Sequence, residues 1–490
     1  MSAASYLARA NGPDLFQVEG VSRDTLSVIP QGGQMMNRRL AAATGVLVAF
    51  ALSWPLGAQV ARRSPAASDR ASAGATTAAL MPATNPEALG FDTQRLARLD
   101  AYMAKAVDDG RVAGMITLLA RHGQVVSEKS YGYRSLATKA PMTRDTIFRL
   151  YSMSKPITGV AMMLLFEEGR WRLDDPITRF VPEFKNLKVM NWAGGDGSGT
   201  LEDMKRPPTM RQLMSHTAGF GYGLSDRHPV DKMYREKSVL GAKGLAEMIA
   251  RTAEIPLMYQ PGTRWSYSSA VDIQGYIVEK LSGQRFGDFL QERIFKPMKM
   301  TDTAFYVPRE KASRLAAVYV GNPKTGTIEE AIQLFGTNMP TYLEPPSMES
   351  GGGGLVGTIT DYARFAQMVV NKGELDGVRL LSPASVEMMG TNMLPKDVLA
   401  RGDGLPGQRF DDAIGFGLDF QVVTEPRVAG SLEGRGSMSW GGAAGTWFWV
   451  DPTNDLIFVG MIQRMGDTGG DPFGAIARTL TYQALAHPER

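Results

Sequence analysis

The fold of this chain is decided by the stretch Ile147-Phe148-Arg149-Leu150-Tyr151-Ser152-Met153-Ser154-Lys155, which leads into a helical pattern over residues 156–169. Ser152 and Lys155 are three residues apart at the start of that helix, so their side chains share one face. A serine hydroxyl is a weak nucleophile until a base removes its proton. We expect partial burial and the positive end of the helix to lower the pKa of Lys155, so that its amine can serve as the base. A capping serine followed by a solvated lysine would give the same spacing.

A second candidate segment runs from Pro261 to Ser269 and reads Pro-Gly-Thr-Arg-Trp-Ser-Tyr-Ser-Ser. Pro261 and Gly262 predict a turn that presents the following residues as a loop. Tyr267 can act there as a general base if cations lower its pKa, and Lys155 is the candidate cation. The alternative is a packed tyrosine with a hydrogen-bonded hydroxyl.

A third candidate segment is Ser439-Trp440-Gly441-Gly442-Ala443-Ala444-Gly445, between two predicted strands near the carboxyl end. Its small residues allow a substrate to approach the backbone closely, and backbone N–H groups there can stabilise an oxyanion. The alternative is an ordinary β-hairpin turn.

Together, and in this order, the three segments resemble the serine hydrolases of the class C β-lactamase, DD-peptidase and family VIII carboxylesterase group. The motifs of that group are S-x-x-K, then Y-x-N or Y-S-x, then K-T-G, H-x-G or W-G-G. The likeness extends over residues 88–490. It includes four further segments: Leu173–Pro176, Leu213–Gly219, Ile294–Met300 and Ser350–Leu355.

The resemblance implies a role for each motif residue. Ser152 attacks a carbonyl and forms an acyl-enzyme, while Lys155 and Tyr267 shuttle the proton. The backbone N–H groups of Ser152 and Ala443 form the oxyanion hole. The substrate-binding residues are Trp440, Gly441, Gly442 and Ser269, with Trp440 lining the acyl or alcohol pocket.

Two departures from the β-lactamase pattern bear on the substrate. Ser269 stands where that pattern has Asn, which weakens amide recognition. Trp440 and Gly441 stand where it has Lys and Thr, side chains that help hold the substrate carboxylate in penicillin-recognising relatives. We therefore expect a serine carboxylesterase that hydrolyses short-chain esters through an acyl-serine intermediate. A β-lactamase or D-amino-acid peptidase with the same machinery is the alternative.

The remaining patterns predict an α+β fold of the β-lactamase-like kind, with an antiparallel sheet flanked by helices and a smaller helical domain beside it. Helices are predicted over 93–109, 360–371 and 473–486, and a hairpin over 114–131. Later strands are predicted at 417–423, 438–440, 446–450 and 456–462. Residues 192–208 are expected to be an exposed loop, and Gly351–Gly354 a flexible turn before a helix. The catalytic α/β domain is expected to comprise 88–170 and 345–490, and the helical domain 171–344.

The amino-terminal region does not fit the fold. Residues 1–34 are expected to be a disordered extension, or untranslated if synthesis begins at Met35 or Met36. Residues 35–58, with basic residues followed by an apolar run, predict a signal peptide or an amino-terminal membrane anchor. Residues 59–87 are expected to be a flexible linker. Export to the periplasm or the medium follows from a signal peptide, with anchoring at the amino terminus as the alternative.

Composition excludes several other kinds of function. The 490 residues include 53 Lys and Arg against 50 Asp and Glu, so the net charge is small and nucleic acid is not expected as a partner. There is no cysteine, and the four histidines are scattered, which argues against a metal or another cofactor. His216 is expected at a structural helix end, and a Ser-His-Asp triad is disfavoured. The expected partner is a small-molecule ester.

Overall fold

The structure of the chain is a computed structural model that describes residues 80–194, 199–322, 324–334, 337–405, 408–466 and 472–488. The predicted extension 1–34, the predicted signal or anchor segment 35–58 and residues 59–79 of the predicted linker lie outside this description. The linker prediction is wrong at its carboxyl end. There, β1 (Met81–Pro82) pairs with a strand of the main sheet and a short 3-10 helix, η1, spans Glu87–Leu89.

Within the described residues, the main sheet holds nine strands in the order β1-β3-β2-β19-β18-β17-β16-β15, with β4 paired to β3. All of these pairs are antiparallel except β1 with β3. The remaining strands are β2 (Gly114–Arg121), β3 (Gln124–Ser135), β4 (Ala140–Pro141), β15 (Ile414–Phe416), β16 (Gln421–Val423), β17 (Met438–Gly441), β18 (Trp447–Asp451) and β19 (Leu456–Met461). The two ends of the fold share this sheet, because β2 lies beside β19 with Leu119 opposite Phe458.

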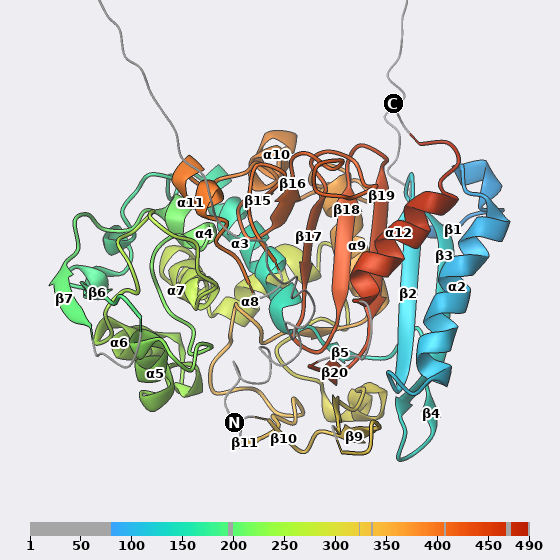
Figure 1. The fold of residues 1–490 in the computed structure, drawn as a ribbon, viewed down its shortest axis with the longest axis horizontal. Helices are drawn as coiled ribbons and strands as arrows, with labels where there is room; N and C mark the ends of the chain where they lie inside the picture. Colours follow the sequence, from blue (N-terminus) through green and yellow to red (C-terminus); the bar gives the residue numbers. More distant parts are fainter. Residues whose placement is uncertain are drawn as a thin grey trace, which may run out of the picture. The chain divides into compact units, whose positions relative to one another are not determined.

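Both faces of the sheet are covered by helices, which explains why β2 and β19 are buried along their whole length. Alternate residues of β19 enter different cores: Phe458 packs in the core beneath α2 (Thr93–Asp108) and α12 (Phe473–Ala484). Ile457 and Val459 pack in the other core, with α9 (Ile359–Val370) and α3 (Ser154–Glu167). Figure 1 shows α2 and α12 together on one face of the sheet. The predicted α+β arrangement, an antiparallel sheet flanked by helices, is confirmed.

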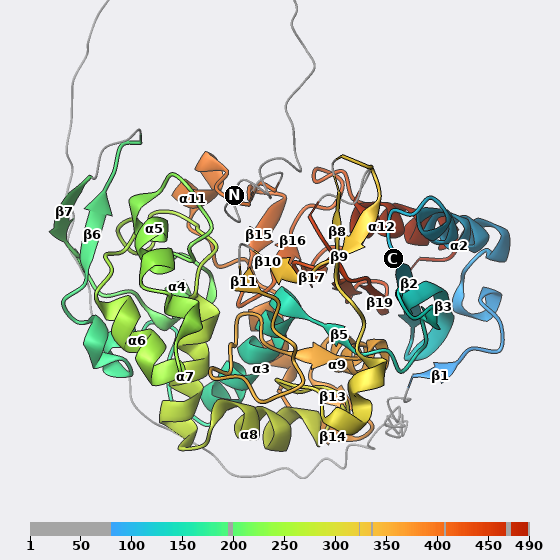
Figure 2. The same ribbon diagram turned by 90° about the horizontal axis from the view of Figure 1, so that it is seen from below.

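A group of helices lies beside the sheet, with α3 between the two (Figures 1 and 2). Helix α3 is apolar on all sides and buried, as a helix packed between two layers should be. The group consists of α4 (Met210–Met214), α5 (Pro229–Glu236), α6 (Leu245–Ala253), α7 (Ala270–Ser282) and α8 (Phe286–Leu290). Shorter helical segments before, within and after this group are η3 (Ile177–Arg179), η4 (Pro182–Phe184), η5 (Val239–Gly241), η6 (Gln291–Phe295) and η7 (Arg309–Arg314). Later helices are α10 (Pro383–Met389) and α11 (Lys396–Arg401).

Small ladders complete the described part of the fold. They pair β5 (Phe148–Arg149) with β12 (Val356–Gly357), β6 (Lys188–Asn191) with β7 (Thr200–Asp203), β10 (Gln333–Leu334) with β11 (Thr337–Asn338), and β13 (Glu374–Leu375) with β14 (Val378–Arg379). A three-stranded ladder joins β20 (Arg464–Met465), β8 (Tyr319–Gly321) and β9 (Ile328–Glu330). None of the helices in the described ranges has the length and apolarity needed to cross a bilayer.

Two local predictions need correction. The predicted strand 417–423 is a turn followed by β16, because Asp419 takes a left-handed backbone conformation with φ 63° and turns the chain back so that β16 pairs with β15. The predicted exposed loop 192–208 contains β7, which pairs with β6 through backbone hydrogen bonds. Neither feature is visible in hydrophobic periodicity, since a short hairpin with mixed residues has no clear alternation.

Candidate active site

Ser152 lies on a tight turn between the short strand β5 and the buried helix α3. The residue before it, Tyr151, has φ 45°, a left-handed conformation that is uncommon outside glycine. Neighbouring segments hold this turn in place. Leu150 donates its N–H to Leu355 O at 2.9 Å, and Tyr362 donates its hydroxyl to Met153 O at 2.9 Å. The nucleophile turn is therefore fixed by contacts with residues two hundred positions later in the chain.

Lys155 occupies the first turn of α3, because the helix begins at Ser154, two residues before the predicted start. Its side chain is fully buried. The ammonium nitrogen Nζ donates to Ser152 Oγ at 3.2 Å, to the Tyr222 hydroxyl at 3.3 Å and to Gly352 O at 2.5 Å. The lysine thus contacts the serine directly, which excludes the alternative of a solvated lysine.

Tyr267 belongs to the loop that precedes α7, and its ring lies beside the Lys155 ammonium. Lys155 Nζ lies 4.5 Å from the centre of the Tyr267 ring. The indole nitrogen of Trp440, on β17, donates to the Tyr267 hydroxyl at 3.3 Å. The structure therefore brings together one residue from each of the three motifs.

The third motif approaches the nucleophile through its glycines. A Cβ on Gly442 would collide with the Leu150 carbonyl oxygen and the Thr446 hydroxyl, so only glycine fits at this position. Gly442 donates its N–H to Thr446 O at 2.7 Å, and Gly445, with φ 84°, closes the turn by donating to Gly442 O at 2.9 Å. The turn holds Ala443 in the wall of the cavity that also contains Ser152. Its backbone N–H remains a predicted donor for the oxyanion.

These residues line a cavity of about 410 Å³. Apolar and uncharged polar side chains make up most of its wall, and Arg478 of α12 is its one charged member among the described lining residues. The wall consists of Ser152, Leu224, Tyr267, Leu405, Gln408, Gln421, Ser439, Trp440, Gly441, Gly442, Ala443, Trp447, Phe448, Gly474, Ala475 and Arg478.

Ser269 is not part of that wall, so its predicted role in substrate binding is corrected. Its side chain is fully buried, and its hydroxyl donates to the Tyr234 hydroxyl at 3.5 Å. Its backbone N–H donates to Gly221 O at 3.0 Å. Ser269 precedes α7 and turns inward, so it supports the Tyr267 loop rather than contacting a substrate.

The electrostatics differ from the prediction for Lys155. Burial opposes its positive charge, but the hydroxyls of Tyr222 and Tyr267 and the carboxylate of Asp272 outweigh burial and raise the pKa of Lys155 above its ordinary value. Lys155 is therefore an ammonium in the resting site. In that form it donates to Ser152 Oγ and stabilises negative charge that develops on nearby oxygens.

The Gly351–Gly354 run forms a turn, as predicted, but its contacts hold the turn in place and make it part of the site. Gly351 and Gly352 are buried, and Gly352 supplies the carbonyl oxygen that accepts from Lys155. Asp272 of α7 fixes this loop by accepting from the Gly352 N–H at 3.1 Å and from the Ser350 hydroxyl at 2.5 Å. The run of four glycines is a sequence signal for such a close approach of the backbone.

Tyr222 and Asp272 were missed by the sequence analysis. Tyr222 follows the Leu213–Gly219 segment, and its hydroxyl contacts Lys155. Burial raises its pKa, so it remains a neutral phenol. Neither residue belongs to one of the three motifs: Asp272 comes to the site because α7 packs against α3, and Tyr222 because the loop between α4 and α5 reaches Lys155.

His216 lies behind Tyr267 rather than beside Ser152. Its ring centre is 5.0 Å from that of Tyr267, and its Nδ1 forms a hydrogen bond of 3.0 Å with Ser268 Oγ. Burial, with the nearby Lys155 cation, holds the pKa of His216 well below its ordinary range, so the imidazole is neutral. His216 therefore packs and orients the Tyr267 loop, as expected of a structural residue.

A serine in contact with a buried lysine, a tyrosine and a glycine-rich strand turn around one cavity are the arrangement of a serine hydrolase. The chain belongs to the beta-lactamase family, whose Beta-lactamase model matches residues 99–483. The resemblance drawn from the motifs is thereby confirmed.

Relatives support the same assignment. The chain is 36% identical over 381 residues to Protein Rv1367c of Mycobacterium tuberculosis, covering 77% of this chain and 92% of that protein. It is 30% identical over 381 residues to Esterase EstB of Burkholderia gladioli, covering 75% of this chain and 90% of that protein. The solved structure of "EstCE1, a hydrolase with promiscuous acyltransferase activity" aligns with a TM-score of 0.66 at 26% identity, covering 79% of this chain and 99% of that one.

Proposed function

We propose that this protein is a serine carboxylesterase that hydrolyses short-chain esters through an acyl-serine intermediate. The observation that carries the proposal is the contact between Trp440 and Tyr267 in the wall of the cavity. It puts a neutral, apolar side chain beside the predicted proton-transfer groups. Esterase relatives of the same family support the proposal.

The first half of the reaction forms the acyl-enzyme. Ser152 Oγ attacks the ester carbonyl carbon, and its proton passes to the Tyr267 oxygen, which reacts as a phenolate beside the Lys155 ammonium. The backbone N–H groups of Ser152 and Ala443 stabilise the oxyanion of the tetrahedral intermediate. The ester C–O bond then breaks, and Tyr267 returns the proton to the departing alcohol oxygen.

The second half releases the acid. A water molecule replaces the alcohol, Tyr267 accepts a proton from it, and the water oxygen attacks the acyl carbon. The bond to Ser152 Oγ breaks, and the proton returns to that oxygen. The Lys155 ammonium stabilises the negative charge on Ser152 Oγ as this bond breaks, which is why its raised pKa suits the mechanism.

The size of the cavity supports small substrates. A volume of about 410 Å³ lies near the lower end of the range of small-molecule sites. Its wall is mainly apolar, which favours neutral acyl and alcohol groups over charged ones.

A β-lactamase or D-amino-acid peptidase activity is the second candidate, and Arg478 is the observation that favours it. Its guanidinium lines the same cavity and could face a substrate carboxylate. The charge is already offset, however, because Arg478 Nε lies 3.1 Å from the buried carboxylate of Glu433. This pairing makes carboxylate recognition the weaker of the two candidates.

A side-by-side assay tests the proposal. The purified chain is incubated with p-nitrophenyl butyrate and with a chromogenic cephalosporin, and Ser152→Ala serves as the control. We expect rapid ester hydrolysis, slow or absent cephalosporin hydrolysis, and a loss of at least about a thousandfold in the variant. The opposite substrate preference would favour the β-lactamase alternative. Ester hydrolysis that survives in Ser152→Ala would refute the mechanism.

We also propose that the protein is exported, on the basis of the basic and apolar segment 35–58. Amino-terminal sequencing of the protein recovered from the periplasm or the medium tests this. A new terminus close to residue 58 supports cleavage, and an intact amino terminus in the membrane fraction supports an anchor.

A further inference from the structure

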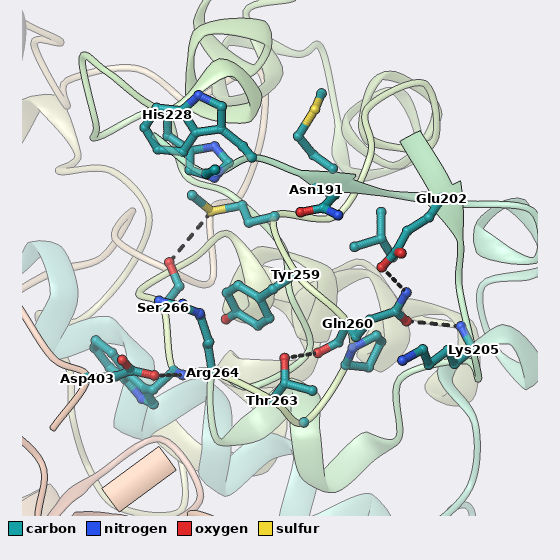
Figure 3. A pocket seen from close by; sticks show the side chains of 18 of the residues that line it. Asn191, Glu202, Lys205, His228, Tyr259, Gln260, Thr263, Arg264, Ser266 and Asp403 are labelled. Carbon is teal, nitrogen blue, oxygen red and sulfur yellow. Dashed lines mark hydrogen bonds between the residues drawn. The ribbon is translucent and has the colours of Figure 1, made fainter. Parts of the chain in front are cut away.

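A second and larger cavity, of about 820 Å³, lies on the far side of the Tyr267 loop. Figure 3 shows labelled side chains from β6, β7 and the loop 258–266 arranged around it. Its wall consists of Val189, Met190, Asn191, Trp192, Ala193, Gly194, Glu202, Lys205, Arg206, His228, Met258, Tyr259, Gln260, Pro261, Gly262, Thr263, Arg264, Trp265, Ser266 and Asp403. It shares no lining residue with the catalytic cavity: Ser266 faces this cavity, whereas Tyr267 faces the catalytic one.

The cavity has an excess of positive charge. Lys205, Arg206 and Arg264 line it, and in the part of the chain that the structure describes none of the three side chains has an ion-pair partner. The Arg206 guanidinium lies over the Pro261–Gly262 turn, 3.2 Å from where a Cβ on Gly262 would stand. The three cations are therefore free to bind an anion in the cavity.

The two acids of the wall are already engaged. Glu202 accepts a hydrogen bond from Gln260 Nε2 at 2.7 Å. Asp403 accepts from the Trp265 backbone N–H at 3.1 Å and lies 3.7 Å from Arg401 Nε. These contacts hold both carboxylates against the protein, and the lysine and the two arginines outnumber them, so the wall keeps a net positive charge.

The wall is also aromatic. Trp192, Tyr259 and Trp265 all line it. The indole N–H groups of Trp192 and Trp265 are buried and have no acceptor among the described residues. These nitrogens have almost no accessible surface, so the aromatic residues of the wall contribute their ring surfaces, which suit an aromatic ligand.

We propose that this cavity binds an aromatic carboxylate. A planar carboxylate matches the fork of an arginine guanidinium and forms charge-assisted hydrogen bonds with it. An aromatic body would pack against the indole and phenol rings of the wall. The volume suits a small organic ligand. The site is separate from Ser152, so the inference does not depend on the proposed ester hydrolysis.

Calorimetric titration of the full chain with 2-naphthoate tests the site, and the neutral 2-naphthamide is the comparison ligand. Ser152→Ala is titrated alongside, because binding in the second cavity is independent of the catalytic serine. We expect the wild type and Ser152→Ala to bind one naphthoate molecule equally well. We also expect naphthamide to bind at least about tenfold more weakly, because it lacks the negative charge that pairs with the cations of the wall.

Variants locate the binding. Arg206→Ala combined with Arg264→Ala should weaken naphthoate binding by at least about tenfold. Lys296→Ala removes an exposed lysine outside the cavity and should leave binding unchanged. If the double variant does not fold, the single change Arg264→Glu, at an exposed side chain, gives the same test. Thermal melting followed by circular dichroism shows whether each variant folds. No binding, equal binding of the amide, or unchanged binding in the arginine variants would overturn the proposal.

Discussion

The indole nitrogen of Trp440 lies 3.3 Å from the hydroxyl oxygen of Tyr267 and donates a hydrogen bond to it. The same Trp440 ring packs against Tyr267, with ring centres 5.5 Å apart, and against Phe416. Trp440 therefore has a second role besides lining the substrate cavity. It orients the hydroxyl group that the proposed mechanism uses for proton transfer.

Trp440→Phe should retain most of the ring packing and remove only the N–H donor. Because a single hydrogen bond contributes about 1 kcal/mol, we expect kcat for p-nitrophenyl butyrate to fall about fivefold to tenfold, with a smaller change in KM. Steady-state kinetics measure both values. An unchanged kcat would mean that the indole N–H does not orient Tyr267.

Gly352→Ala should impair catalysis with little loss of fold. A Cβ there would stand 2.7 Å from Asp272 Oδ2 and 2.9 Å from the Tyr222 hydroxyl, which is too close for either contact. The loop must shift, and the carbonyl that accepts from Lys155 moves with it. We expect kcat/KM to fall at least about tenfold.

Gly353→Ala is the matched control for that change. The nearest atoms to its Cβ are those of Tyr151 at 3.7 Å, an ordinary packing distance. Comparable activity in the two variants would contradict the positioning role of the Gly352 carbonyl.

Gly442→Ala should disturb the nucleophile turn. Its Cβ would collide with the Leu150 carbonyl oxygen, and so push the β17–β18 turn away from Ser152. We expect a loss of at least about a hundredfold in kcat, because the Ala443 N–H is displaced along with the turn. Gly441→Ala, whose Cβ would meet only Thr446 O at 3.3 Å, should lose much less. If Gly442→Ala were as active as Gly441→Ala, the proposed oxyanion hole would be wrong.

His216 should make the folded state less stable in mild acid. Its pKa in the folded protein is well below the ordinary value of 6.5, so below that pH the unfolded chain binds a proton that the native state does not. Stability from this group is present above pH about 6.5 and is lost as pH falls, by up to about 1.4 kcal/mol per pH unit. Urea unfolding at a series of pH values measures the slope.

His216→Gln should flatten that pH dependence, whereas His487→Gln, at an exposed histidine near the carboxyl end, should not. An identical slope in the wild type and in His216→Gln would show that the buried imidazole is not the source of the acid sensitivity.

The elements that sequence patterns predicted well are those with long periodic segments. Helices α2, α9 and α12 and the β2–β3 hairpin lie close to the predicted ranges because each buries one continuous apolar face or strand. The three motifs also predicted that Ser152, Lys155, Tyr267 and Trp440 share one site, since their residue types and order are specific to one kind of chemistry.

What the patterns could not predict depends on contacts between distant segments. The Gly352 carbonyl reaches Lys155 only because β12 pairs with β5, and Asp272 reaches that loop only because α7 packs against α3. The raised pKa of Lys155 follows from the same convergence, because Tyr222, Tyr267 and Asp272 come from separate segments. Ser269 was misplaced for a related reason: the start of α7 turns its side chain away from the cavity.

The central claim is that Ser152 is the residue that becomes acylated. Mass spectrometry tests this claim most directly. The chain is first treated with diethyl p-nitrophenyl phosphate, which transfers a diethylphosphoryl group to active serines, and the serine releases that group slowly. We predict one diethylphosphoryl group per chain, located on the peptide that contains Ser152, and none on Ser152→Ala. A diethylphosphoryl group on another residue would contradict the account. Ester hydrolysis by the Ser152→Ala variant would contradict it as well.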